Sequence, residues 1–282
     1  MKRRTVFIIA ACVAVVTFGA AAVGIVALAL RQNRVKSAGS SRWASTQYLD
    51  IHLEGDLPEQ SSSSFGTFLE KRPPSLRTIV QSFDRAAKDA RVKSVMLRVN
   101  SLSGVGWGKI EELRGAVTRF RESKKPVYAY LEFSGNKEYY LATACTKIFA
   151  VPTGLLDVTG LHAEVTFFRN TLDKLGIAAE FEGIGKYKNA PNQFTESSFT
   201  EPHREQMTAL LDSLFARYVK GVAESRGISE EKVRELIDGG PYDAREAQKA
   251  GLVDELLYRD EVLERLEHAR RLTPSRLSLI HI

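Results

Sequence analysis

The residues best placed to do chemistry in this sequence lie in EGIGKYKNAPNQF, residues 182–194. Lys186 and Lys188 stand there between two glycines and Pro191. An ordinary lysine has a pKa of about 10.4 and is protonated at neutral pH, whereas burial favours the neutral amine that can accept a proton. Lys186 and Lys188 can therefore be solvated loop residues, or one of them can be a general base.

Metal and cofactor sites find little support elsewhere in the sequence. The five histidines are widely spaced, with no HxH or HxxxH pair, and the two cysteines form no CxxC pair. Cys145 lies in the apolar stretch LATACTKIF and is expected to be a small buried hydrophobic residue. GVGWG at residues 104–108 lacks the GxGxxG pattern of a dinucleotide-binding turn. We therefore expect no metal and no cofactor.

The composition is typical of a globular protein and not of one that binds nucleic acid. The chain has 282 residues, is 44% hydrophobic and carries a formal net charge of +6. Its lysines and arginines are scattered, without the one-sided clustering or the motifs that nucleic-acid binding uses. We expect one domain of about 200 residues beside a membrane anchor, and no nucleic-acid partner.

The N-terminal part of the chain predicts a membrane anchor. Residues 5–30 contain no charged side chain and follow the basic start MKRR, a short cytoplasmic stub. A helix of that length rises about 39 Å, more than the roughly 30 Å hydrocarbon core of a bilayer. The run is too long for a cleaved signal peptide, so 1–30 is predicted to be an uncleaved anchor that contacts lipid through 5–30. Residues 31–46 read as a polar linker.

Hydrophobic periodicity after residue 46 alternates between strand-like and helix-like segments. Strands are predicted over 48–55, 93–100, 126–133, KIFAVP and 178–185. Helices are predicted over 74–92, 109–125, 165–176, 202–227 and 229–240, and a helix with a short strand over 242–257. This alternation predicts an α/β domain with a mostly parallel sheet.

The last six residues, LSLIHI, resemble the translation of a transposase adaptor used in sequencing libraries. We therefore expect natural sequence to stop near Arg276, and residues 277–282 do not enter the fold prediction. On this interpretation the chain is a fragment of a longer protein.

Four stretches together resemble the signal peptide peptidase A family of membrane-anchored serine proteases. They are RVKSVMLRVNSLSGVG, KKPVYAYLEFSGNKEYYLATACTKIFAVPTGLLDVTG, FFRNTLDKLGIAAEFEGIGKYKNAPNQFTESSFT and DGGPYDAREAQKAGLVDEL, and they cover about residues 48–258. The resemblance implies a Clp-protease/crotonase-like fold over 47–276, preceded by one transmembrane helix. It also implies a serine–lysine dyad that needs neither metal nor ATP.

The resemblance implies that Lys188 is the general base and that Lys186 occupies a variable position. Single-domain family members carry the nucleophile in an ASGGYY-like turn, and the serine of that turn corresponds here to Asn136. Ser134 lies two residues out of register, which would displace its hydroxyl by several ångströms. This departure matches the long, two-domain members, in which a C-terminal half supplies the serine. The dyad would then join Lys188 to a serine beyond Arg276.

Five further residues are candidates for lining a catalytic groove. Gly104 and Gly106 follow a predicted strand, where they can supply oxyanion-hole N–H groups or form a tight turn. Thr159 and Gly160 align with a loop that faces the groove in relatives, and Asn136 stands at the nucleophile's position.

The resemblance implies a membrane-anchored endopeptidase that degrades cleaved signal peptides and other short peptides. It implies a homotetramer in the bacterial inner membrane, with a single span and the soluble domain outside the cytoplasm. The charges flanking the span are nearly balanced and favour this orientation slightly. Two alternatives remain open: a complete short protease that uses Ser134, and a non-catalytic scaffold of the same fold. An ASGGYY-like turn beyond Arg276 would favour the two-domain protease, and its absence would favour the scaffold.

Overall fold

The computed structural model describes residues 47–59 and 74–268. The predicted anchor over 5–30, the linker and the adaptor-like tail lie outside these ranges. Within the ranges described, no helix is both long and apolar enough to cross a membrane. The transmembrane helix therefore stays a prediction.

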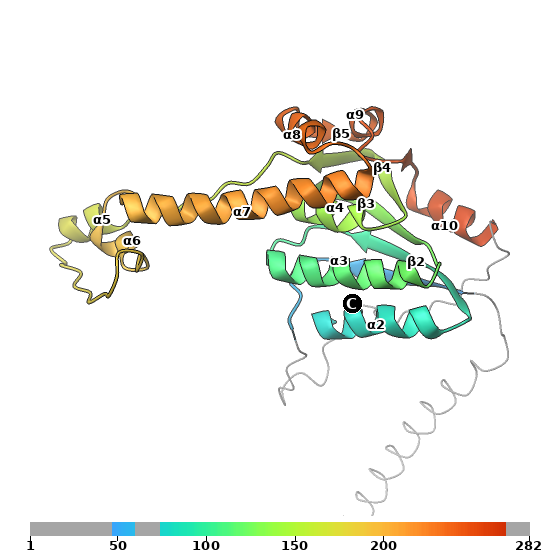
Figure 1. Cartoon of the computed structure of the whole chain (residues 1–282), viewed down its shortest axis with the longest axis horizontal. Helices are drawn as coiled ribbons and strands as arrows, with labels where there is room; N and C mark the ends of the chain where they lie inside the picture. The colour runs from blue at the N-terminus through green and yellow to red at the C-terminus, as the bar shows by residue number, and fades with distance from the viewer. Residues whose placement is uncertain (1–46, 60–73, 269–282) are drawn as a thin grey trace, which may run out of the picture. The chain divides into compact units, whose positions relative to one another are not determined.

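A mostly parallel sheet organises the described residues (Figure 1). Four strands pair side by side in parallel, in the order in which they occur in the chain: β1 (Gln47–Leu53), β2 (Val92–Val99), β3 (Val127–Gly135) and β4 (Lys147–Asp157). Two short strands complete the sheet on β4, β5 (Tyr242–Asp243) antiparallel and β6 (Glu255–Leu256) parallel. The predicted mixed α/β fold with a mostly parallel sheet is confirmed.

Neighbouring parallel strands must be joined by crossover connections, and helices form these connections here. The crossovers contain α2 (Leu76–Lys88), α3 (Trp107–Glu122) and α4 (Asn136–Thr143). Side chains of β2 are buried on both faces of the sheet: Val95, Leu97 and Val99 join the large core, and Met96 joins a smaller cluster. That smaller cluster includes Val262 of α10 (Arg259–His268). Coverage of both faces explains why three apolar residues follow one another in β2, at Val95, Met96 and Leu97.

Several helix boundaries follow from capping residues visible in the sequence. The Ser75 hydroxyl accepts from the Thr78 N–H at 3.2 Å and caps the start of α2. The Ser229 hydroxyl accepts from the Lys232 N–H at 3.1 Å and begins α8 (Glu230–Asp238). A capping box at Asp243 begins the short helix α9 (Ala244–Lys249).

The long helix α7 (Glu201–Arg226) reaches beyond the sheet (Figure 1). Its C-terminal third packs on the core through Tyr218, Val219 and Val222. Two short helices, α5 (Arg169–Lys174) and α6 (Asn192–Thr195), lie beside its N-terminal end, away from the sheet. We call residues 159–217 the arm.

Aromatic rings pack against one another in the arm, at the N-terminal end of α7. The Phe199 ring lies 5.4 Å from that of Phe167 and 4.7 Å from that of His203, between ring centroids. His203 is the buried residue of the N-terminal half of α7. These edge contacts join the segment before α5 to the first turn of α7.

One predicted strand is wrong. Residues 178–185 form no strand, and the side chains of Phe181 and Ile184 are 54% and 99% exposed. The helix predicted over 165–176 shortens to α5. Side-chain alternation fits an extended chain, but a strand also needs a neighbouring backbone to pair with. Within the described residues, the arm offers this segment no such neighbour.

Candidate active site

Lys188 lies in a turn between α5 and α6, at the end of the arm. Its N–H donates to the Gly185 carbonyl at 3.3 Å, and Gly185 has a φ of +87°, a conformation that favours glycine. The Lys188 side chain is exposed, and its ammonium has no hydrogen bond or ion pair with any described residue. The second lysine, Lys186, lies 4.0 Å from the Glu205 carboxylate. The two lysines therefore have different surroundings.

Asn136 is the first residue of α4, at the sharp corner where β3 ends. Its side-chain amide donates to the Gly160 carbonyl at 2.7 Å, and its side-chain oxygen accepts from the Gly160 N–H at 3.4 Å. The structure thus brings together two of the predicted groove residues. Thr159 lies beside them, its hydroxyl 3.2 Å from Asp157 Oδ1. A carboxamide is not an acyl-transfer nucleophile, so Asn136 serves here to join the corner to the loop after β4.

Ser134 is completely buried at the end of β3, with 0% of its surface exposed. Its hydroxyl has no hydrogen-bond partner within the described part of the chain. A nucleophile must reach the carbonyl carbon of its substrate. The enclosed Ser134 hydroxyl does not reach a substrate carbonyl in this structure. The structure therefore does not support the alternative of a complete short protease that uses Ser134 as nucleophile.

The loop that carries Gly104 is fixed to α4 by two neighbouring side chains. Glu138 is 5% exposed and accepts from the Leu102 N–H at 2.6 Å and from the Gly135 N–H at 3.1 Å. Lys137 donates to the carbonyls of Leu102 at 3.1 Å and of Val105 at 2.9 Å. The sequence analysis missed both residues, although an acidic residue three positions after the strand end is a capping-box signal.

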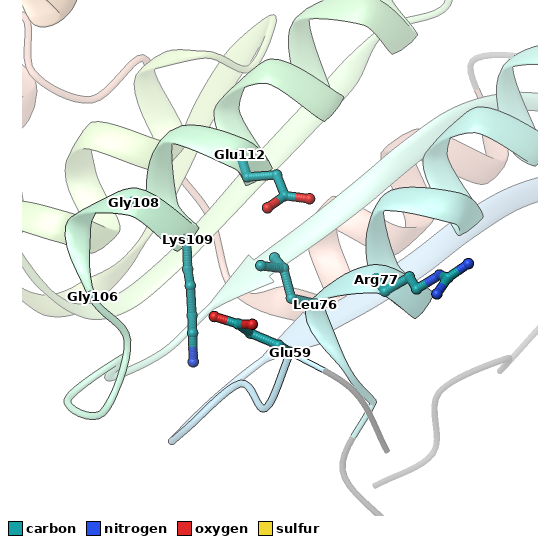
Figure 2. Close-up of a pocket in the computed structure, with 7 residues that line it drawn as sticks. All are labelled: Glu59, Leu76, Arg77, Gly106, Gly108, Lys109 and Glu112. Atoms are coloured by element: carbon teal, nitrogen blue, oxygen red, sulfur yellow. The ribbon is translucent and has the colours of Figure 1, made fainter. Parts of the chain in front are cut away.

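Gly104 and Gly106 have different environments. A Cβ atom at Gly104 would lie 2.9 Å from the Cβ of Asp56, so the backbone packs closely there. Gly106 caps α3 without a side chain and borders a pocket of about 500 Å³ (Figure 2). The pocket lies between α2 and α3 and is lined by Glu59, Leu76, Arg77, Gly106, Gly108, Lys109 and Glu112. Lys188 and Asn136 are not among its lining residues, so the structure does not join all predicted site residues in one groove.

Cys145 is 7% exposed, and burial raises the pKa of its thiol to about 12. The prediction that Cys145 is a small buried residue is confirmed. Within the described residues, no three histidine, cysteine or acidic side chains are grouped as metal ligands.

The model of one family, "Peptidase family S49", matches residues 119–273. The chain belongs to peptidase family S49. The matched residues run from α3 through α10 and include the Asn136 corner, the arm and Lys188.

Several curated proteins resemble this S49 chain. It is 34% identical over 219 residues to "Serine protease SPPA, chloroplastic" of Arabidopsis thaliana, covering 78% of this chain and 32% of that protein. It is 28% identical over 213 residues to "Protease 4" of Salmonella typhi, covering 73% of this chain and 34% of that protein. The chain thus spans about a third of the length of these relatives.

Among solved structures, a membrane-bound stomatin-specific protease matches with a TM-score of 0.45 and 15% identity, covering 78% of this chain and 84% of that one. The Clp-protease/crotonase-like assignment stays a prediction.

Proposed function

We propose that this chain supplies the general-base lysine, Lys188, of a serine endopeptidase with a serine–lysine dyad. Two observations together carry the proposal. Lys188 lies at the end of the arm without a polar partner among the described residues, and Asn136 stands at the corner where the nucleophile would be expected. Membership of a peptidase family supports the reaction class. The serine then belongs to sequence beyond Arg276 or to another chain.

The chemistry requires only the two side chains and a water molecule. The serine oxygen attacks the peptide carbonyl while the neutral lysine amine takes the hydroxyl proton. The resulting ammonium returns that proton to the leaving amine, which leaves an acyl-enzyme. Water then attacks the acyl-enzyme while the lysine takes one of its protons, and the lysine passes that proton to the serine oxygen as the carboxylate product leaves. Because the proton must leave the lysine first, assembly of the active protease must remove Lys188 from bulk water.

The proposed substrates are cleaved signal peptides and other short peptides. The name "Protease 4" of the Salmonella relative supports proteolysis without defining the substrate. We further propose a single-pass anchor through residues 5–30 in a bacterial inner membrane, with the peptidase domain outside the cytoplasm. The uncharged run in the sequence supports the anchor.

A direct test compares Lys188→Met with Lys186→Met in the protein encoded by the complete gene. Methionine keeps the length and apolar stem of lysine but cannot accept a proton. Loss of a general base lowers kcat by about 10²–10⁴-fold, so Lys188→Met is expected to fall into that range. Lys186→Met is expected to retain the base and most of the activity. Wild-type peptide hydrolysis by Lys188→Met would reject the proposal.

A scaffold without catalytic activity is the second candidate, and the bonded Asn136–Gly160 corner favours it. The genomic sequence beyond codon 276 separates the two candidates. A second α/β half with a serine in an SGGYY-like turn supports the dyad. A stop codon without such a half supports the scaffold.

A further inference from the structure

Both neighbours of Lys188 are bonded to consecutive residues of α7. The Tyr187 hydroxyl donates to Glu205 Oε2 at 2.9 Å. The Asn189 side-chain amide donates to Gln206 Oε1 at 2.8 Å, and Asn189 is 9% exposed. The chain is therefore held to the helix immediately before and immediately after the lysine.

The stem of Lys188 also rests against its own loop. A Cβ atom at Gly183 would lie 3.5 Å from Cγ of Lys188, so the lysine stem passes over the backbone at that glycine. The left-handed conformation of Gly185 turns the chain back and makes this contact possible. Asn189 is itself held by Asn192, whose amide donates to Asn189 Oδ1 at 3.2 Å. The loop around Lys188 is thus held by the bonds of Tyr187 and Asn189 to α7 and by the bond of Asn192 to Asn189.

The Glu205 carboxylate, which accepts the hydrogen bond of Tyr187, also forms an ion pair with Lys186. Lys186 Nζ lies 4.0 Å from Glu205 Oε2 and 4.5 Å from the centre of the Tyr187 ring. Tyr187 first, and Glu205 after it, raise the pKa of Lys186. A carboxylate that instead paired with Lys188 would favour its protonated form and oppose its use as a base. Lys186 is therefore the lysine that pairs with this carboxylate, and among the described residues Lys188 forms no such pair.

We propose that the Tyr187–Glu205 and Asn189–Gln206 hydrogen bonds form a clamp that positions Lys188 for proton transfer. The inference rests on the proposed role of Lys188 as general base. The four clamp residues are positioning residues: they act through the backbone on either side of Lys188 and do not touch the substrate. The clamp fixes the backbone on both sides of Lys188 and so the position from which its side chain extends. A serine supplied from elsewhere must come within hydrogen-bond reach of the lysine amine.

The test uses Glu205→Ala, Glu205→Gln and Asp212→Ala in the protein encoded by the complete gene. Alanine removes the acceptor for the Tyr187 hydroxyl, whereas the glutamine oxygen can still accept it. Asp212→Ala is the matched control, because Asp212 is an exposed acid of the same helix whose side chain forms no hydrogen bond or ion pair with a described residue. The readouts are kcat and KM for a peptide substrate, together with hydrogen exchange of the amides of residues 186–190.

We expect Glu205→Ala to lower kcat by about 10-fold or more at an unchanged KM, since a misplacement of about 1 Å can cost about 10²-fold. The same variant should speed exchange of the loop amides, and Glu205→Gln should restore both values. Asp212→Ala should match the wild type in both. Wild-type kcat in Glu205→Ala would overturn the clamp, as would an equal loss in Glu205→Ala and Glu205→Gln.

The same measurements separate failure of the clamp from failure of the proposed function. If Lys188→Met remains fully active, Lys188 is not the base, and the clamp fails as a catalytic device whatever the exchange data show. If Lys188→Met is inactive while Glu205→Ala is fully active with faster exchange, the base stands and the clamp alone is rejected.

Discussion

Glu138 serves two parts of the candidate site with one carboxylate. One of its oxygens holds the loop after β2 through Leu102, and the other holds the end of β3 through Gly135. The two N–H groups belong to segments more than thirty residues apart in the sequence; the bond to Leu102 is buried and the bond to Gly135 is partly buried. The spacing between the Gly104 loop and the Asn136 corner therefore depends on Glu138.

Replacing Glu138 with alanine is expected to destabilise the fold by about 2–4 kcal/mol. Each buried donor left without an acceptor costs about 1–3 kcal/mol, and partial solvation reduces the sum. Urea unfolding followed by circular dichroism measures the change. Glu122→Ala, at the exposed C-terminal end of α3, is the control and should unfold with the wild type. An equal midpoint for Glu138→Ala and wild type would contradict the assigned role.

The lowered pKa of the Asp254 carboxyl predicts how the stability of the fold depends on pH. Burial raises the pKa of this carboxyl, but hydrogen bonds from Arg226 at 3.0 Å and from the Ile148 N–H at 2.6 Å outweigh burial and lower it. A carboxyl with a lowered pKa in the folded state stabilises the fold above its unfolded value of about 3.9. That contribution is lost as the pH falls through the lower, folded value.

We therefore expect the free energy of unfolding to decrease as the pH falls below about 4. Asp254→Asn should be less stable than the wild type at neutral pH, because the partly buried Arg226 loses its charged partner. It should also show a shallower loss of stability in acid. Unfolding curves at several pH values between 6 and 2.5 (a range of roughly three units) measure both effects. Parallel acid profiles for the two proteins would show that Asp254 does not contribute.

At the scale of elements, α7 packs on α4 at a glycine. A Cβ atom at Gly221 would lie 2.6 Å from Cε2 of Tyr140, a buried ring whose hydroxyl donates to Glu111 at 3.0 Å. The close approach of the two helices thus requires a residue without a side chain. Gly115 in α3 is a suitable comparison, because a Cβ there would meet only the mobile end of Arg119, at 3.2 Å.

Gly221→Ala and Gly115→Ala are expected to change stability in opposite directions. Alanine favours a helix over glycine by about 1 kcal/mol, so Gly115→Ala should stabilise the fold by up to that amount. Gly221→Ala gains the same propensity but forces the Tyr140 ring to move, at a net cost of about 1–3 kcal/mol. Thermal unfolding of both variants measures the difference. Stabilisation by both would show that α7 can shift on α4 without strain.

The sequence predicted the elements whose signals are local. Alternation and helical periodicity located β1 to β4 and α2, α3 and α7. The strand predicted over 178–185 failed because pairing depends on a neighbour that sequence periodicity does not reveal. The roles of Glu138 and of the Tyr187 and Asn189 anchors were missed for a related reason: their partners are distant in the sequence, and only the folded chain brings them together.

At the scale of the whole molecule, the arm presents apolar side chains that the described residues leave uncovered. Met207, Leu210, Leu211 and Leu214 follow helical spacing on α7; Leu210 is 54% exposed and the others are partly exposed. Exposed apolar side chains continue along the arm at Leu175, Ile177, Phe181 and Ile184. A surface of this kind is typical of an interface. The homotetramer that the family resemblance implies stays a prediction, and we propose this surface as the contact between its subunits.

Leu210→Asp is expected to weaken assembly without unfolding the domain. A charge in an apolar interface is costly, whereas the same charge on an exposed helix position in the monomer is tolerated. Light scattering of the detergent-solubilised protein should show smaller particles for Leu210→Asp than for the wild type. Lys220→Asp, on an exposed part of α7 nearer the core, is the control. Identical particle masses for Leu210→Asp and wild type would remove this surface from the interface.

The position of β4 has a consequence for how the protein is made. Its neighbour β3 is synthesised shortly before it, but its other neighbours, β5 and β6, follow only after the arm and α7 have left the ribosome. Until then the edge of β4 that pairs with β5 and β6 is open. Chains that fold through such late, long-range pairings are slow and prone to aggregate while they wait. The arm therefore delays closure of the sheet during synthesis, and holding chaperones should improve the yield of folded protein.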